Sequence, residues 1–366
     1  MINKIFIALA GLWLAAGGVQ ARAAEAAAPE ESILRQPGMV KSEFIVNNPP
    51  FATSHASTIV ESKDLLLAAW FGGTKERALD VSIWLSRFEG GAWSPPEQVA
   101  NGIHDDVRVR YPCWNPVLFR PLAGPLVLFY KEGPSPESWW GMVKVSNDNG
   151  RSWTIGKKLP NNIFGPVRNK PIELEDGTLL CGSSTENEGW RVHMERTKNP
   201  LKGWSRTPPL NRTLDFGAIQ PTILFHATNS IQILCRTKNE AIAESWSDDG
   251  GLTWSRMLAT ELPNPNSGID SVVLKDGRSL LVYNHSPTSR NVLNVAVSPD
   301  GRGWQGALVL ESSANPEDEF SYPAVIQTAD RMVHVTYTWK RQKIRHVVID
   351  PEKLSPKEMV GGQWPW

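Results

Sequence analysis

The stretch Ser247-Asp248-Asp249-Gly250-Gly251-Leu252-Thr253-Trp254 decides the fold, because it is a turn that the chain repeats at a regular interval. Related turns run from Ser146 to Trp153 and from Ser298 to Trp304, and degenerate copies end at Trp93 and Trp204. The tryptophans at 93, 153, 204, 254 and 304 are separated by 60, 51, 50 and 50 residues. A period of this length is typical of a repeated supersecondary unit such as a propeller blade.

A second marker repeats with the same period. A polar or aromatic residue precedes a small residue or proline and then a β-branched, aliphatic run. The six copies begin at His55, Asn115, Lys170, Gln220, Asp270 and Tyr322. Each copy is followed by a turn and a second apolar strand, and no long segment has a helical period. The second strands are expected at Leu65–Phe71, Leu126–Tyr130, Thr178–Cys181, Ile231–Cys235, Ser279–Tyr283 and Met332–Tyr337. We therefore predict an all-β, six-bladed β-propeller, with residues 39–54 supplying an outer strand that closes the ring.

Side chains within the repeated turn favour a structural role. Serine and aspartate hydrogen-bond to backbone N–H groups inside a turn, so Asp148, Asp249 and Asp300 are interpreted as turn residues.

The three cysteines, an odd number, lie in or beside apolar strands and are expected to be buried thiols. They are Cys113, Cys181 and Cys235.

Composition and the first residues indicate the compartment and the class of partner. The 366 residues include 38 Lys and Arg and 38 Asp and Glu, and zero net charge argues against nucleic acid or an anionic membrane as partner. Lys4, an apolar run and Ala21-Arg22-Ala23 predict a cleavable signal peptide over residues 1–23, and hence a periplasmic or secreted protein. Residues 24–38 are expected to be a flexible lead-in, and 39–366 one propeller domain. No metal-ligand spacing or cofactor motif is found.

The repeated turn resembles the Asp-box of the sialidase (neuraminidase) superfamily, over roughly residues 50–345. In that family an arginine triad binds the substrate carboxylate, a tyrosine acts as nucleophile beside a glutamate, and an aspartate is the acid/base. The resemblance implies that Arg236 and Arg290 are the second and third triad arginines. It places Tyr322, in Phe320-Ser321-Tyr322-Pro323-Ala324, at the nucleophile position.

Three positions depart from the family pattern. His55 stands in place of the first triad arginine, and the neutral Gln220 stands near the position of the glutamate. Glu76 and Asp80 are the available substitutes for the acid/base aspartate. The sequence is therefore similar to sialidase-like propellers with an altered catalytic set, among them lyases that release terminal rhamnose from glucuronate.

The strand ends of a propeller converge on a central funnel, and this convergence defines the expected site. The catalytic candidates are His55, Tyr322, Arg236 and Arg290. Candidate substrate-binding residues are Asn115, Lys131, Lys170, Glu186, Gln220, Asp270 and Trp339. Funnel arginines favour an acidic glycan, because a guanidinium pairs bidentately with a carboxylate. Tryptophans at 70, 114, 139 and 140 are candidates for stacking on sugar rings.

Two chemistries and a binding role remain open from the sequence. In β-elimination on a uronic acid, His55 and Tyr322 suit the base and acid roles while arginine neutralises the carboxylate. In retaining hydrolysis, Tyr322 attacks the anomeric carbon, but Gln220 cannot activate it as a base. The preferred hypothesis is a lyase of the rhamnosyl-glucuronate type. The alternatives are an exo-α-sialidase and a non-catalytic glycan-binding propeller.

Overall fold

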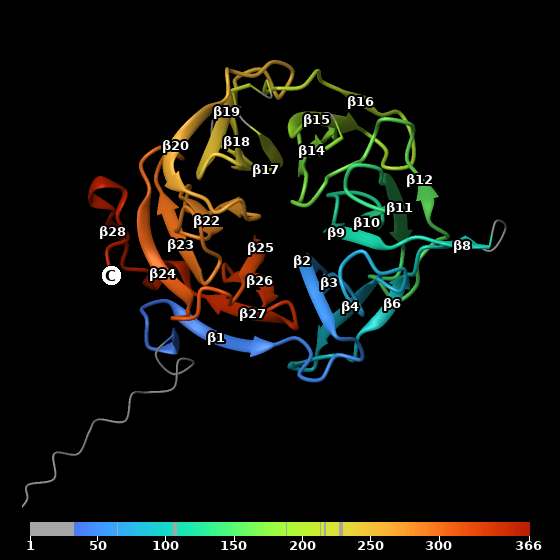
Figure 1. Ribbon diagram of the computed structural model, residues 1–366, viewed down its shortest axis with the longest axis horizontal. Coiled ribbons are helices and arrows are strands. Elements are labelled where there is room, and N and C mark those ends of the chain that lie inside the picture. The colour runs from blue at the N-terminus through green and yellow to red at the C-terminus, as the bar shows by residue number, and fades with distance from the viewer. Residues whose placement is uncertain are drawn as a thin grey trace, which may run out of the picture.

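Six small antiparallel sheets surround a central axis in the computed structural model (Figure 1), which confirms the predicted propeller. The structure describes residues 33–366 apart from 64, 105–107, 188, 213, 216 and 227–229. The predicted signal peptide therefore lies outside the described residues. In the described part of the chain, no helix has the length and apolarity needed to span a bilayer.

Blades 1 to 3 follow one another along the chain, and each runs from an inner strand outward. Blade 1 contains β2 (Thr53–Ser62), β3 (Leu65–Gly73) and β4 (Ser82–Glu89), with β5 (Ala92–Trp93) and β6 (Glu97–Ala100) pairing β4. The short hairpin of β7 (Ile103–His104) and β8 (Val109–Arg110) leads to blade 2. Blade 2 contains β9 (Cys113–Phe119), β10 (Leu126–Glu132), β11 (Trp140–Ser146) and β12 (Lys157–Lys158). Blade 3 contains β13 (Ile172–Glu173), β14 (Leu179–Thr185), β15 (Arg191–Thr197) and β16 (Ser205–Arg206).

Blades 4 to 6 complete the ring. Blade 4 contains β17 (Ala218–Phe225), β18 (Ile231–Thr237), β19 (Ala241–Ser247) and β20 (Leu258–Pro263). Blade 5 contains β21 (Asp270–Val273), β22 (Ser279–Tyr283), β23 (Val292–Ser298) and β24 (Gln305–Ser312), with β28 (Lys357–Glu358) on its outer edge. Blade 6 contains β25 (Phe320–Gln327), β26 (Val333–Trp339) and β27 (Lys343–Ile349). Two 3-10 turns, η2 (Pro351–Lys353) and η3 (Val360–Gly362), follow.

The N-terminal strand closes the ring, as predicted. β1 (Met39–Phe44) pairs antiparallel with β27 and so becomes the fourth strand of blade 6. The segment before β1 is also attached to the propeller, because the Gln36 side chain donates to the Val309 carbonyl at 2.7 Å and accepts from the Val309 amide at 2.9 Å. Residues 33–38 are therefore docked on blade 5, and the expected flexible lead-in does not extend to residue 38.

The Asp-box turns of blades 2, 4 and 5 each pack against the preceding blade. Asp249 accepts hydrogen bonds from the backbone and hydroxyl of Thr253, and Ser247 holds the Gly251 amide at 2.9 Å. Gly251 has φ +80°, and a Cβ there would lie 2.8 Å from Leu180 of blade 3. The predicted structural role of Asp249 is consistent with these contacts, because its carboxylate serves its own turn.

Apolar cores fill the spaces between neighbouring blades. One cluster joins Leu280 and Val295 of blade 5 to Val335 and Val347 of blade 6, and the other blades are packed in the same way. All three cysteines are free and buried, as expected. Three of the side chains considered for ligand or sugar contact in fact lie within the blades: Trp70, Trp114 and Lys131 are 2% exposed or less.

Candidate active site

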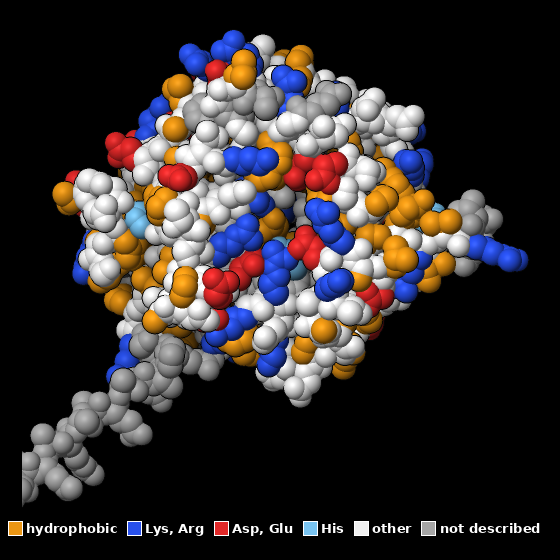
Figure 2. All heavy atoms as spheres, viewed as in Figure 1, with side chains coloured by type: hydrophobic (Ala, Val, Ile, Leu, Met, Phe, Trp, Pro, Cys, Tyr) orange, Lys and Arg blue, Asp and Glu red, His pale blue; other side chains and the backbone are white. Residues whose placement is uncertain are grey.

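The inner strands of four blades are interrupted near one end, where they approach the axis. β2, β9, β17 and β25 each carry a register shift at this point. The shifts coincide with positive φ angles at Ala56 (52°), Asn115 (38°), Gln220 (56°) and Tyr322 (53°). A β-bulge redirects the side chains beside it, so these positions turn polar groups toward the funnel mouth. Figure 2 shows basic and acidic side chains intermixed around the centre of this face.

Tyr322 is the partly exposed centre of the mouth, and three guanidinium groups surround its ring. The carbon atoms at the centres of the Arg168, Arg236 and Arg290 guanidiniums lie 5.1, 5.4 and 5.9 Å from the ring centroid. A guanidinium this close to an aromatic face is within cation–π range. Arg236 also donates from Nη1 to the phenol oxygen at 2.5 Å. Two strands, β18 and β25, and two connecting loops thus bring four cationic and aromatic groups together.

A single turn holds two of the arginines in place. Asn266, at φ +55°, accepts from Arg236 on its side-chain oxygen and from Arg290 on its backbone oxygen at 2.6 Å. The turn is closed by Asn264, which accepts from the Ser267 amide and donates to the Ser267 carbonyl. The arginines are therefore preorganised, because their orientation is set by backbone groups that do not need to move.

Arg168 was not among the predicted residues, and it is the most deeply placed of the three arginines. It is 3% exposed and donates to the carbonyls of Pro323 and Ile269. Burial lowers the pKa of Arg168 to about 10, although Asp270 opposes this effect. Gly268 makes the packing possible, since a Cβ there would lie 3.1 Å from Arg168 Nε and 3.3 Å from the Tyr322 ring.

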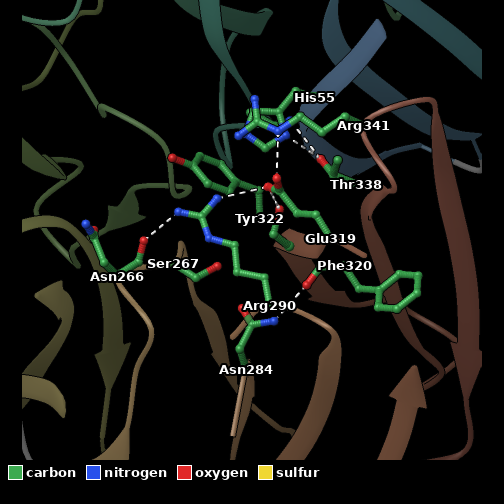
Figure 3. A network of polar contacts seen from close by, with 12 residues as sticks. His55, Asn266, Ser267, Asn284, Arg290, Glu319, Phe320, Tyr322, Thr338 and Arg341 are labelled. Carbon is green, nitrogen blue, oxygen red and sulfur yellow. Dashed lines mark hydrogen bonds and ion pairs between the residues drawn. The ribbon is translucent and has the colours of Figure 1, made fainter. Parts of the chain in front are cut away.

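Glu319 links Arg290 to a fourth arginine, Arg341, across the mouth (Figure 3). One carboxylate oxygen accepts from Arg290 Nη1 at 2.9 Å, and the other accepts from Arg341 Nε at 2.8 Å. Burial alone would raise the pKa of Glu319, but the charges of Arg341 and Arg290 hold it well below the ordinary value. Arg341 also pairs with Glu76, which joins blade 6 to the β3–β4 loop of blade 1. Glu319 is thus a fixed anion, and Glu76 serves as an ion-pair partner.

His55 lies beneath Tyr322. Its ring is 2% exposed, its centroid is 4.2 Å from that of Tyr322, and Nδ1 lies 2.9 Å from the Thr338 hydroxyl. Burial lowers the pKa of His55 well below the ordinary value, and the charges of Arg341 and Arg290 act in the same direction. The imidazole is therefore neutral, and Tyr322 separates it from the mouth.

Glu186 lies on the other side of Arg236, and its pKa is shifted in the opposite direction to that of Glu319. The Arg236 guanidinium lies over the Trp190 ring at 5.2 Å and the Lys238 ammonium at 4.3 Å, and Glu186 is close enough for Trp190 to act on its pKa. Burial raises the pKa of Glu186, and nearby Arg236 opposes this only in part. Glu186 is therefore the mouth carboxyl best suited to carry and donate a proton.

Several predicted substrate-binding residues are engaged in the protein itself. Lys170 and Asp270 pair with each other at 2.9 Å, and Asp270 also accepts from the Thr222 hydroxyl and the Val325 amide. The Lys131 ammonium donates to the Pro166 carbonyl at 2.8 Å, away from the mouth. The Lys170–Asp270 pair joins blade 3 to blade 5, Lys131 holds the connection between blades 2 and 3, and each of these polar groups already has a partner in the protein.

The other predicted residues divide between the mouth and the scaffold. The Gln220 side chain accepts from Arg236 at 3.3 Å and so helps to fix that arginine, while Asn115 is buried at the bulge of β9. Trp339 packs between Phe44 and Phe320, within blade 6. Asp80 accepts from the amide and hydroxyl of Thr74 in its own loop.

Comparison with known proteins gives a family once this geometry is established. Residues 64–335 match the model of the BNR repeat-like domain. The chain belongs to the BNR repeat-like domain family. The search of curated proteins found no match.

Solved structures similar to this BNR repeat-like protein include sialidases. NanB sialidase from Streptococcus pneumoniae has 11% identity and a TM-score of 0.70, covering 87% of this chain and 71% of that one. The intramolecular trans-sialidase from Ruminococcus gnavus has 12% identity and a TM-score of 0.67, covering 85% and 97%. A Dyadobacter fermentans protein described as of unknown function has 16% identity and a TM-score of 0.71, covering 86% and 99%. At these identities the similarity establishes the sialidase-like propeller fold.

Proposed function

We propose that this protein is a carbohydrate-active enzyme that binds an acidic sugar at the funnel mouth and cleaves the terminal linkage to it by β-elimination. The observation that supports this best is the partly exposed phenol of Tyr322 in contact with Arg168, Arg236 and Arg290. Such a cluster of fixed donors stabilises negative charge that develops near it during a reaction. The net charge of the whole protein is zero, so this cluster of three arginines is a local concentration of positive charge.

The substrate carboxylate is assigned to the two arginines that solvent reaches. Arg290 and Arg341 have side-chain exposures of 24% and 33%, whereas Arg168 and Arg236 are buried. Arg341 is paired on its outer side with Glu76, whose side chain is 40% exposed. An exposed ion pair contributes little, so a substrate carboxylate can displace Glu76 at small cost.

The proposed reaction uses Tyr322 and Glu186 on opposite sides of Arg236. Acting as a phenolate, the Tyr322 oxygen takes the proton from the carbon next to the carboxylate and becomes a neutral phenol, and the electron pair of that C–H bond forms the new C4–C5 double bond. The C4–O bond breaks, and its electron pair leaves with the departing sugar oxygen, which receives a proton from Glu186. Arg236 stabilises the charge on the Tyr322 oxygen through the bond it already makes. His55 supports the phenol ring from beneath and so acts as a positioning residue.

A hydrolase is the second candidate, and Glu186 is the observation that favours it. A carboxyl group whose pKa is raised by burial is also suited to protonate the leaving oxygen in glycoside hydrolysis. In that reaction Tyr322 would attack the anomeric carbon, as the resemblance to sialidases implies.

One assay separates the candidates. The purified protein is incubated with rhamnosyl-glucuronate oligosaccharides and, separately, with sialyl-lactose. β-Elimination produces the ultraviolet absorbance of a 4,5-unsaturated uronate together with free rhamnose. Release of sialic acid without that absorbance would select the hydrolase. Retention of either glycan on an affinity column without any product would select a binding protein.

A further inference from the structure

We propose that a groove beside the funnel mouth, between blades 2 and 3, is a second sugar subsite that takes a neutral residue on the leaving side of the scissile bond. This inference rests on the proposed function for the identity of the first sugar. The groove encloses about 450 Å³, and it is lined by the 136–140, 160–164 and 185–187 segments. That volume lies within the range of small-molecule sites.

The groove adjoins the reacting groups through Glu186, which lines it. Arg236 and Trp190 are close enough to Glu186 to act on its pKa. Trp190 in turn carries the Arg236 guanidinium, which donates to the Tyr322 oxygen. Glu186 therefore stands between the groove and the cluster of Trp190, Arg236 and Tyr322. A sugar whose linkage oxygen meets Glu186 must place its ring in the groove.

The wall of the groove is held rigidly from behind by buried charged residues. Glu195 is fully buried and accepts from the backbone amides of Phe164 at 3.0 Å and Gly165 at 2.6 Å. The fully buried Lys131 donates to the next carbonyl, that of Pro166, at 2.8 Å. Burying charged groups is costly unless they are well bonded, and here both are used to fix one short loop. The 163–166 segment is therefore a preformed wall.

The chemistry of the lining selects a neutral sugar. The apolar part of the surface comes from Trp139, Trp140 and Phe164, and the rim carries uncharged hydrogen-bonding groups such as Ser138 and Asn161. The charged lining residues are Glu137, Glu186 and Lys158, and the Lys158 ammonium lies over the Trp140 ring at 4.7 Å. A second uronate would face the Glu137 carboxylate, and the described lining offers it one lysine and no arginine. A sugar ring can place its apolar face on the aromatic side chains and its hydroxyl groups on the uncharged polar rim.

The test compares two ligands that share the same acidic sugar. One is glucuronate with a neutral hexose on O4, and the other is 4-O-methyl-glucuronate, which leaves the groove empty. Dissociation constants are measured by calorimetry and cleavage by ultraviolet absorbance. The wild type is expected to bind or process the disaccharide about tenfold better than the methyl ether.

Variants decide whether the groove produces that difference. Asn161→Trp fills the groove from an exposed position and is expected to remove the preference while the methyl ether value stays within about twofold. Leu122→Trp, at a 92% exposed site on the opposite end of blade 2, is the matched control and keeps the preference. Lys131→Met is expected to raise KM for the disaccharide more than it lowers kcat, because it loosens only the wall.

The outcomes separate this inference from the proposed reaction. A preference for the disaccharide in calorimetry without any unsaturated product would support the subsite and reject β-elimination. Equal affinity of the wild type for the two ligands, or an unchanged preference in Asn161→Trp, would overturn the subsite. Failure of both ligands to bind would overturn it as well, together with the assignment of the first sugar.

Discussion

His55 and Tyr322 stack with their ring centroids 4.2 Å apart and their planes inclined by 49°, so that a buried neutral imidazole supports a partly exposed phenol. The positive φ of Tyr322 belongs to the bulge that turns its side chain toward the mouth. The phenol is consequently fixed from below by His55 and at its oxygen by Arg236. This arrangement predicts different consequences for changes at the two residues.

Replacing Tyr322 by phenylalanine removes the oxygen and keeps the ring. We expect turnover to fall by about 10²–10⁴-fold, the range for losing a group that transfers a proton. Affinity for the uncleaved acidic sugar should change little, because the proposed carboxylate contacts come from Arg290 and Arg341. Steady-state kinetics and calorimetry measure the two effects, and near-wild-type turnover would remove Tyr322 from the reaction.

Two replacements of His55 distinguish a supporting ring from a reacting base. His55→Phe retains an aromatic ring beneath Tyr322, and we expect its kcat to stay within about tenfold of wild type. His55→Ala leaves a cavity under the phenol, and we expect a loss of about 2–4 kcal/mol in the free energy of unfolding, with a larger loss of kcat. If both variants were equally inactive while folded, His55 would have to take part in proton transfer.

Arg290 is expected to contribute to substrate binding. Arg290→Ala removes one of the two exposed guanidiniums, and a hydrogen bond to a charged group is worth about 1.5–3 kcal/mol, so KM should rise by roughly 10–100-fold. Arg278→Ala is the matched control, because this arginine lies in the same blade and pairs with Asp276 away from the mouth. An unchanged KM in Arg290→Ala would place the carboxylate elsewhere.

Blade 6 contains a pH-sensitive pair of histidines. The rings of His334 and His346 stack at 5.2 Å, His334 Nδ1 lies 2.9 Å from His346 Nε2, and His346 Nδ1 lies 3.0 Å from Glu43 of β1. Burial lowers the pKa of His334 to about 4, and the neighbouring His346 acts in the same direction while Asp330 opposes it. The unfolded chain takes up this proton near pH 6.5 and the folded protein only near pH 4, so stability is lost as pH falls between these values.

The loss attributable to His334 should be roughly 3 kcal/mol when the shift is fully expressed. Urea unfolding at pH 7.5 and pH 5 measures the part lost over that interval. His334→Gln should show a smaller loss than wild type, and His226→Gln in blade 4 should behave as wild type. An equal loss in all three proteins would contradict the assignment to His334.

The architecture was predictable from the sequence because the same marker residues recur at a regular interval, once in each blade. The tryptophan-ended turns and the leader residues recur every 50–60 residues, and each copy became one sheet. The closing role of the segment before Thr53 followed from the need of the last blade for a fourth strand. Asp-boxes could be interpreted correctly since their hydrogen bonds are local, within four residues of Asp249.

The candidate site was only partly predictable, because its contacts join distant parts of the chain. Arg236, Arg290 and Tyr322 do meet, but Arg168, Glu319 and Asn266 lie in connections between blades, where no repeat marked them. Lys170 and Asp270 occupy leader positions yet pair with each other across 100 residues. The bulges that decide which leader side chains face the mouth depend on the register between strands, and a one-residue change in register alters the facing of a side chain.

Because β1 closes the ring, this protein can complete its fold only late in synthesis. Met39 of β1 pairs with Ile349 of β27. The first strand therefore stays unpaired while the ribosome adds some three hundred further residues. A chain that stops short of β27 has no place for β1, and both exposed strands then become templates for misassembly. Interrupted synthesis should therefore give insoluble or rapidly degraded fragments and not a smaller working ring.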